Sequence, residues 1–400
     1  MAGGTEPEEE TRPQKMISAG LVNYGFASID DLRVSAKALK SDDVQLTFQS
    51  IFVAGQGSPG LRGVSNYSCY MNPAAIALRH PKNSGTVLAF TEARWPSCND
   101  FLCRDGVCGR HDIALRRSTD NGVTFGEMQL VVQVDRDWNS ANDSIFNVAP
   151  VEDVSTGKIL VLYNRQPAYY NTLARMYNPR ARETFVSAST DAGQTWTSPR
   201  NITSQLVGGK NPAWTNSRNP TAVTPGPGIQ LLTGKRRGRL LVPGYGCPLE
   251  AGDICTTYSL NSSLRSWALI SDTGGETWRI GGATPVVGSA EPMAVELTNG
   301  GVLMNMRSVQ WKHDDEPHPE RFRQYTLSTD QGETFGLVHA GEYANLVGPS
   351  CQASFIRAGS ALLFANPANQ EQRLDMTLRV SYDEAKTWAK SISVYANSSW

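Results

Sequence analysis

The sequence has no apolar run that approaches the roughly 18–20 residues of a membrane-spanning helix. It also has no excess of charge, because 37 Lys and Arg are balanced by 38 Asp and Glu. A net charge of −1 gives no electrostatic reason to expect binding to nucleic acid or to a membrane surface. A basic signal-peptide start is missing as well, since residues 6–12 are acidic and contain proline. We therefore expect no membrane span and no nucleic-acid partner, and we expect residues 1–15 to be disordered.

Amphipathic helical patterns are equally scarce, and only the stretch from Leu32 to Leu39 extends beyond two turns. Short segments rich in β-forming residues recur instead, at 158–163, 239–242, 301–306 and 361–365. Hydrophobic residues make up 40% of the chain, which is enough for a substantial core. The sequence therefore predicts an all-β globular protein.

One eight-residue pattern, Ser-x-Asp-x-Gly-x-Thr-aromatic, repeats along the chain. Asp and Ser side chains bond to their own backbone and close a tight turn, and Gly accepts the positive φ that the turn demands. The third copy has Thr273 in place of Asp, and the last has Ala385 in place of Gly. Each copy, here called an Asp box, predicts one hairpin turn; the five copies are 118–125, 189–196, 271–278, 328–335 and 381–388.

The spacing of the Asp boxes indicates a β-propeller. Successive boxes are farther apart than the ~40–50 residues of one four-stranded blade, which leaves room for a blade and loops of variable length. We predict a six-bladed β-propeller domain over residues 45–400, preceded by a partly disordered N-terminal lead-in over residues 1–44. A β-sandwich or β-helix with recurrent turns is the alternative, and the spacing disfavours both.

Cysteines and glycosylation signals bear on the compartment and on metal binding. The chain has seven cysteines, and five Asn-x-Ser/Thr sequons, a combination typical of an oxidising compartment. No export signal accompanies them, so the localisation stays open. Cys98, Cys103, Cys108 and His111 could ligate zinc, but they lack short Cys-x-x-Cys pairs, and disulfides or free thiols are the better interpretation. We expect no metal and no cofactor. The sequons begin at Asn66, Asn142, Asn201, Asn261 and Asn397.

An ordered set of motifs resembles the sialidase (neuraminidase) family over about residues 45–400. An Ala-Phe-x-Glu-x-Arg strand is followed by an Asp-bearing loop, Asp-Ile-x-Leu-Arg-Arg-Ser and the first Asp box. Asp boxes alone are weak support, because unrelated propellers also carry them. The family is six-bladed, has its active site at the centre of the propeller, and removes terminal sialic acids from glycans. The segments that carry the resemblance are 89–94, 112–118, 291–297, 303–308 and 364–373.

The resemblance implies a role for each of five residues. Sialic acid has a carboxylate beside its anomeric carbon, so its recognition calls for clustered arginines, here Arg307 and Arg373. That carboxylate would repel a carboxylate nucleophile, and sialidases use a tyrosine instead. Glu291 matches the residue that takes the tyrosine's proton, Arg94 the residue that contacts the sugar ring, and Asp100 the general acid/base. Any one of these residues alone would more simply be structural or solvated; their joint order favours the functional interpretation.

Two departures from the family pattern leave alternatives open. Met71 stands where the family has its first carboxylate-binding arginine, and methionine cannot donate hydrogen bonds. The nucleophilic tyrosine is expected beyond Trp400, since Tyr395 resembles the strand residue before it, so we expect an incomplete last blade and weak activity of residues 1–400 alone. The sequence predicts a retaining exo-α-sialidase acting on sialylated glycoproteins, glycolipids or oligosaccharides. A catalytically impaired, lectin-like sialoglycan-binding propeller is the alternative, and an Asp-box scaffold without a sugar site is a third.

Overall fold

The computed structural model describes residues 16–20, 28–35, 50–55, 67–96, 98, 110–138, 143–167, 182–206, 222–246, 264–285, 288–309, 322–340 and 346–396. These residues form mainly β-strands, with one short α-helix, α1 (Val134–Trp138), and two 3-10 turns, Pro81–Asn83 and Thr203–Gln205. None of the helices in this part of the chain is long and apolar enough to cross a bilayer. The all-β prediction is confirmed.

The strands form six successive antiparallel units, which we call blades 1 to 5 and the N-terminal sheet. Blades 1 and 2 are joined by a single parallel bridge between His111 and Ser144. The N-terminal sheet contains β1 (Met16–Gly20), β2 (Ser28–Ser35) and β3 (Ser50–Val53). Blade 1 contains β4 (Cys69–Ala77), β5 (Val87–Trp95), β6 (Arg110–Ser118) and β7 (Gln129–Val132); blade 2 contains β8 (Ser144–Asp153), β9 (Lys158–Gln166), β10 (Glu183–Ser189) and β11 (Arg200–Asn201).

The remaining three blades follow in chain order. Blade 3 contains β12 (Ala222–Val223), β13 (Ile229–Gln230), β14 (Leu240–Gly246), β15 (Arg265–Ser271) and β16 (Arg279–Ala283). Blade 4 contains β17 (Ser289–Glu296), β18 (Val302–Ser308), β19 (Gln324–Ser328) and β20 (His339–Ala340). Blade 5 contains β21 (Ser354–Ala358), β22 (Ala361–Pro367), β23 (Met376–Ser381) and β24 (Lys390–Tyr395).

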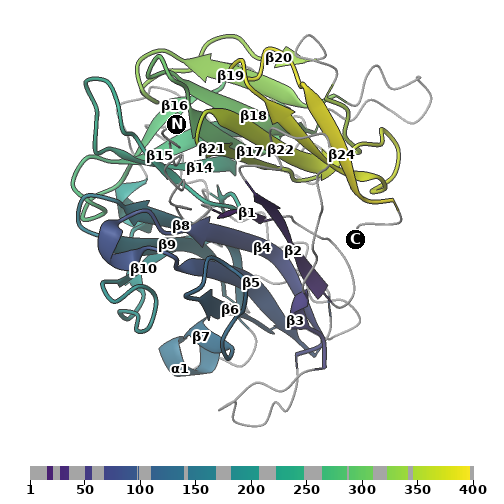
Figure 1. Cartoon of the computed structure of the whole chain (residues 1–400). Helices are drawn as coiled ribbons and strands as arrows, with labels where there is room; N and C mark the ends of the chain where they lie inside the picture. Colours follow the sequence, from purple (N-terminus) through teal and green to yellow (C-terminus); the bar gives the residue numbers. More distant parts are fainter. Residues whose placement is uncertain are drawn as a thin grey trace, which may run out of the picture.

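The innermost strands of the six units contact one another in a closed circuit. Strand β4 contacts β8, β8 contacts β12 and β13, and β13 contacts β17. Strand β17 then contacts β21, and β1 contacts both β21 and β4, so β1 closes the ring between the last blade and the first (Figure 1). The predicted β-propeller is confirmed.

The N-terminal part of the chain differs from what the sequence led us to expect. Its strands β1 and β2 lie within residues 1–44, which were expected to be a lead-in, and the domain boundary at residue 44 stays a prediction. The helical pattern from Leu32 to Leu39 does not form a helix at its start, because residues 32–35 belong to β2 and pair with β1. The sixth blade was expected to lack strands at the C-terminal end of the chain. Among the described residues, blade 5 has four strands, and the sixth unit, the N-terminal sheet, has three.

The hydrophobic core consists of layers between neighbouring blades. Along β9, Ile159, Val161 and Tyr163 pack with blade 1, whereas Leu160 and Leu162 pack with blade 3. Successive side chains of a strand point to opposite faces of its sheet, so a strand buried on both faces reads as a continuous apolar run. This explains why β9 shows no apolar–polar alternation in the sequence.

Each Asp box forms the turn between the last two strands of its blade. In the first box, the Ser118 hydroxyl donates to Asp120 at 2.7 Å and accepts from the Gly122 amide at 2.8 Å. Asp120 in turn accepts from the Thr124 amide at 2.9 Å and from its hydroxyl at 2.6 Å. The boxes therefore form the hairpin turns that the sequence predicted, and they lie at the periphery of the blades, away from the innermost strands.

The two degenerate boxes form the same turn although other residues replace the Asp or the Gly. The Thr273 hydroxyl accepts from the Thr277 amide at 2.8 Å, which replaces the missing carboxylate with a neutral acceptor. Ala385 takes the place of Gly with φ = 64°, a left-handed conformation that non-glycine residues rarely adopt. The turn therefore tolerates loss of the charge and loss of the glycine in different copies.

We expect the Asp boxes to make folding stability depend on pH at the acid end. The hydrogen bond from the Thr124 hydroxyl, followed by that from its amide, lowers the pKa of Asp120 to about 2. Since an unfolded Asp titrates near pH 3.9, this stabilisation is present above about pH 4 and is lost as the pH falls toward 2. The variant Asp120→Thr, which copies the third box, should lose less unfolding free energy than the wild type between about pH 5 and pH 3 in urea titrations. Equal losses in both proteins would contradict this prediction.

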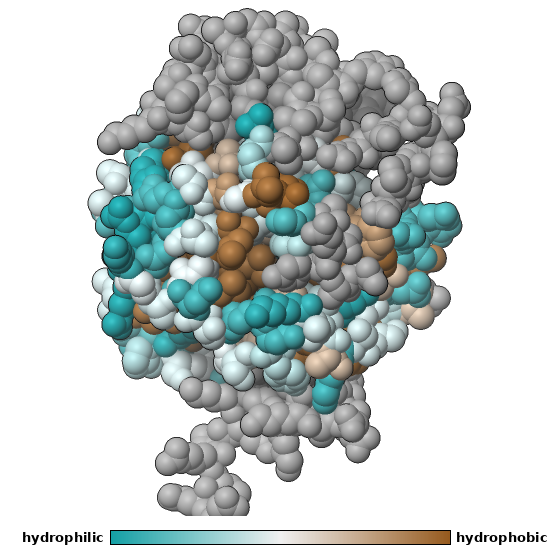
Figure 2. All heavy atoms as spheres, turned by 90° about the horizontal axis from the view of Figure 1, so that it is seen from above, coloured by the Kyte–Doolittle hydropathy of each residue, from teal (hydrophilic) through white to brown (hydrophobic). Residues whose placement is uncertain are grey.

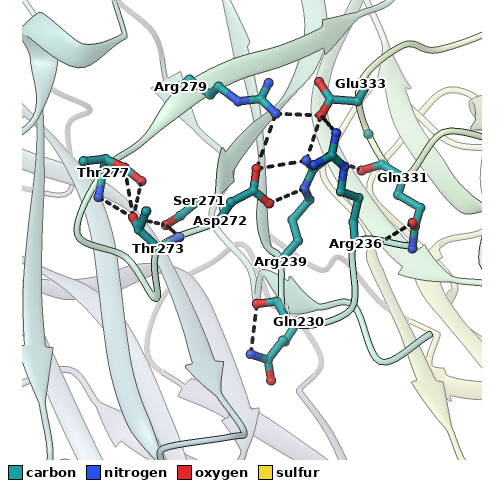
Figure 3. Close-up of polar contacts among 12 residues, drawn as sticks. Gln230, Arg236, Arg239, Ser271, Asp272, Thr273, Thr277, Arg279, Gln331 and Glu333 are labelled. Carbon is teal, nitrogen blue, oxygen red and sulfur yellow. Dashed lines mark hydrogen bonds and ion pairs between the residues drawn. The ribbon is translucent and has the colours of Figure 1, made fainter. Parts of the chain in front are cut away.

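Neighbouring blades are also joined by arginines that reach the Asp boxes. Arg239, which precedes β14 and has a fully buried side chain, binds Asp272 in the third box at 2.7 Å and 2.9 Å. It also binds the Gln331 carbonyl at 2.9 Å and Glu333 at 2.7 Å, both in the fourth box (Figure 3). Arg117 makes a similar bond from blade 1 to a carbonyl of the second box. The boxes therefore connect adjacent blades.

One face of the molecule carries hydrophobic residues near its middle, flanked by hydrophilic residues (Figure 2). Leu327 of β19 and Leu337 after the fourth box are exposed, by 38% and 72%. Apolar atoms contribute more than half of the accessible surface of ordinary folded proteins. This face by itself therefore does not indicate a binding site.

Candidate active site

The innermost strands are interrupted by bulges that carry polar residues. Asn72 in β4, Asn147 in β8 and Glu291 in β17 each lie at a shift in strand register and have φ values of 49°, 59° and 42°. Ser350, before β21, has φ = 56°. A left-handed non-glycine residue costs roughly 1–2 kcal/mol, and bulges cluster beside active sites, where they re-aim side chains. The repeated bulges therefore mark the centre of the ring as the candidate site.

A buried carboxylate organises the blade 1 side of this centre. Glu92 accepts from the Asn72 side chain and from the Asn147 amide, both at 2.8 Å. Its other oxygen accepts from Arg94 at 2.6 Å and 3.1 Å. Arg94 also donates to the carbonyl of Cys98 at 3.2 Å, so its guanidinium is fixed in orientation. The sequence identified Arg94 but not the glutamate that orients it.

Met71 lies directly opposite Glu92 in the pairing of β4 with β5. An arginine at this position would stand across from a buried carboxylate, which could orient it. In this chain the side-chain amide of Asn72 donates a hydrogen bond to Glu92. Blade 1 therefore contributes no guanidinium from position 71 to the centre of the ring.

An ion pair occupies the blade 4 side of the centre. Arg307 donates to Glu291 at 2.9 Å and to the Ser350 hydroxyl at 3.4 Å. The side chains of Arg307 and Glu291 are 23% and 13% exposed, so both remain reachable from solvent. The pair therefore combines a cation that could bind an anionic group with a carboxylate that could accept a proton.

Tyr245, at the end of β14, connects the two sides. Its hydroxyl accepts from the Asn147 side chain at 3.2 Å. Burial, followed by the charge of Glu291, raises the pKa of Tyr245 to about 12, so the phenol is protonated at neutral pH. Hydrogen bonds thus connect Arg94 and Glu92 through Asn147 to Tyr245, and Tyr245 interacts electrostatically with Glu291.

The buried thiol of Cys351 is under the electrostatic influence of three arginines and one glutamate. Burial raises the pKa of this thiol, while the positive charges of Arg323, Arg373 and Arg307 lower it and Glu291 raises it. Burial lowers the pKa of Arg323 to about 10, and it therefore stays charged at neutral pH. Three positive charges and one negative charge make this part of the centre suited to an anion.

Of the five residues that the sequence singled out, Glu291 and Arg307 form an ion pair. These two and Arg373 act electrostatically on Cys351, and Arg94 is bonded to Glu92 on the blade 1 side. Asp100 lies outside the described residues. The roles assigned to all five remain predictions. Glu92, Asn147, Tyr245 and Arg323 were missed, although a polar residue within an apolar innermost strand, such as Asn147, was a usable signal.

The zinc alternative receives no support from the described part of the chain. Cys98 forms a disulfide with Cys69, and a disulfide sulfur is not a thiolate ligand. His111 lies beside Glu92, with 3.8 Å between Nδ1 and the nearest carboxylate oxygen. Among the residues described, no group of three or more His, Cys, Asp or Glu could hold a metal ion. Cys103 and Cys108 lie outside these residues.

Comparisons with known proteins agree with the fold and the motifs. Residues 108–399 match the family model described as a BNR repeat-like domain. A sialidase of Micromonospora viridifaciens is 32% identical over 302 residues, which cover 71% of this chain and 41% of that protein. Human sialidase-4 is 30% identical over 253 residues, which cover 62% of this chain and 47% of that protein. The chain thus spans about half the length of the curated relatives it matches.

Solved structures of similar shape point the same way. The Hadza microbial sialidase Hz136 aligns with a TM-score of 0.66 over 94% of this chain and 68% of that one, at 22% identity. The Trypanosoma rangeli sialidase aligns with a TM-score of 0.60 over 96% of this chain and 53% of that one, at 15% identity. At these identities the structures support the fold, and the family follows from the matched domain and the curated relatives. The chain belongs to the sialidase family of Asp-box (BNR-repeat) β-propellers.

Proposed function

We propose that the protein is an exo-α-sialidase that hydrolyses terminal sialic acid from glycoproteins, glycolipids or oligosaccharides. The observation that carries this proposal is the Arg307–Glu291 ion pair at the centre of the ring, where Arg323 and Arg373 add positive charge that acts on the same region. A substrate with a carboxylate at its anomeric carbon needs clustered guanidinium groups for binding, because each can form a forked pair with the carboxylate. Arg307 and Arg373 are the proposed partners of that carboxylate.

The proposed chemistry is retaining and uses a tyrosine nucleophile. Glu291 would accept the proton of that tyrosine, and its 13% exposed side chain is held by Arg307 beside the site. Asp100 is the proposed acid/base that protonates the leaving oxygen and later activates water. Arg94, fixed by Glu92, is the proposed contact of the sugar ring.

Hydrolysis of an aryl α-sialoside by the native polypeptide tests the proposal, with a neutral aryl β-galactoside as the control substrate. We expect release of the aryl group from the sialoside alone. The variant Glu291→Gln keeps the shape of the side chain but not its basicity, and it should lower kcat by roughly 10²-fold or more while KM changes little. An unchanged kcat would remove Glu291 from the mechanism.

Met71 is the observation that favours the second candidate, a non-hydrolytic sialoglycan-binding propeller. Loss of one carboxylate-binding arginine would misalign the anomeric carbon for attack, whereas Arg307 and Arg373 would still bind the carboxylate. Binding of sialic acid without turnover of the aryl sialoside would support this second candidate. Absence of both binding and turnover would overturn both.

A further inference from the structure

Arg323 is a buried cation that the proposed mechanism leaves without a role. It precedes β19 and is 4% exposed. Its Nε donates to the Asn305 side chain at 2.8 Å, and its Nη1 donates to the Cys351 carbonyl at 2.5 Å. Its Nη2 is buried and has no hydrogen-bond partner in the described part of the chain. Both bonded acceptors are neutral, and burying a charge without a bonded carboxylate is costly.

The segment that Arg323 holds contacts the proposed substrate-binding arginine. Ser350 precedes Cys351 and has the left-handed φ of 56°. Its hydroxyl donates to the Ser308 carbonyl at 2.7 Å and accepts from Arg307 Nε at 3.4 Å. The bond from Arg323 to the next carbonyl therefore fixes the backbone that presents this hydroxyl to Arg307.

The charge of Arg323 also acts on the same site. It interacts electrostatically with Glu291 and Arg307. Arg323, Arg307 and Arg373 are the three positive charges that act on Cys351. Position 71 of blade 1 contributes no such charge, because it is a methionine.

We propose that Arg323 is a positioning residue of the anion site, which orients Arg307 through Ser350 and supplies a buried third positive charge, whereas Met71 supplies none. The inference rests on the proposed function, since it concerns how the carboxylate of sialic acid is bound. Because Nη2 is buried, Arg323 would act on the ligand through its field and through Arg307, without touching it.

Calorimetric binding of the unsaturated analogue 2-deoxy-2,3-didehydro-N-acetylneuraminic acid tests this role. Arg323→Met should weaken binding by about tenfold or more, because a charge acting in a low-dielectric site is poorly screened. The affinity should also depend less steeply on salt, because one cation has been removed. A purely structural role would instead lower the melting temperature and leave the affinity and salt dependence of the folded protein unchanged.

A double-mutant cycle tests the path through Ser350. Ser350→Gly retains the left-handed backbone but removes the hydroxyl, and it should weaken binding by about threefold to tenfold. In the Arg307→Lys background, the same change should have no further effect, because Nε, the donor to Ser350, is gone. If Arg323→Met does not fold, this cycle still tests whether Ser350 orients Arg307.

Arg357→Met is the matched control, since Arg357 pairs with Glu384 away from this site. It should leave the affinity unchanged. This inference would be overturned if Arg323→Met showed normal affinity and salt dependence, Ser350→Gly showed normal affinity, and only Arg307→Lys bound the analogue more weakly. The proposed function would remain supported in that case. Normal affinity in all of these variants, Arg307→Lys included, would overturn the proposed function itself.

Discussion

Replacing Arg307 by lysine should weaken the binding of a sialic-acid analogue by about tenfold to a hundredfold. Glu291 and Ser350 hold the guanidinium of Arg307 in a fixed orientation. Lysine keeps the charge but offers a single ammonium in place of the planar fork, so it cannot form two parallel bonds to a carboxylate. Isothermal titration calorimetry with the unsaturated analogue measures the change.

A second arginine of the same exposure provides the control for this experiment. The side chain of Arg357 is 24% exposed, against 23% for Arg307, and it also pairs with a glutamate. Arg357→Lys should bind the analogue with wild-type affinity. The assignment of Arg307 would be withdrawn if both lysine variants bound the analogue equally well.

Replacing Arg239 by alanine should destabilise the propeller by about 3 kcal/mol or more. This side chain is fully buried and bonds to Asp272 and Glu333, which belong to the Asp boxes of two adjacent blades (Figure 3). The change removes the buried cation and opens a cavity between blades 3 and 4, and among the described residues only the half-exposed Arg279 then still contacts both carboxylates. Urea unfolding monitored by tryptophan fluorescence measures the loss.

Arg236 belongs to the same network but is exposed, and it serves as the control. Its guanidinium is 53% exposed and lies 3.8 Å from Glu333. Since exposed ion pairs contribute about 0–1 kcal/mol, Arg236→Ala should change stability by less than about 1 kcal/mol. Similar losses in the two variants would mean that burial of Arg239 does not determine the strength of this contact between blades.

The parts of the fold that local chemistry determines could be predicted from the sequence. Each Asp box closes its turn with hydrogen bonds among its own eight residues, so five turns could be placed without knowledge of the tertiary structure. The N-terminal sheet has no such box, and its strands are specified by pairing with each other and by the gap between β21 and β4. Tertiary contacts of this kind leave no short-range pattern.

The residues of the candidate site likewise fall into those that the sequence could identify and those that it could not. Arg307, Arg373, Glu291 and Arg94 lie in motifs that the family shares, so the resemblance located them in the sequence. Arg323 and Tyr245 have no motif that separates them from the many structural arginines and tyrosines of the chain. Their place beside Glu291 and Cys351 depends on which blades face each other across the ring, and this is a property of the whole fold.

The position of β1 between the last blade and the first has a consequence for folding during synthesis. Strand β1 is made early, but its neighbour β21 is made near the other end of the sequence. Translation adds about 5–20 residues per second, so β21 is synthesised on the order of tens of seconds after β1. Through that interval, the emerging chain has an open ring with one unpaired flank at each end, a situation that invites intermolecular association. We therefore expect the nascent chain to depend on chaperones until blade 5 has emerged from the ribosome.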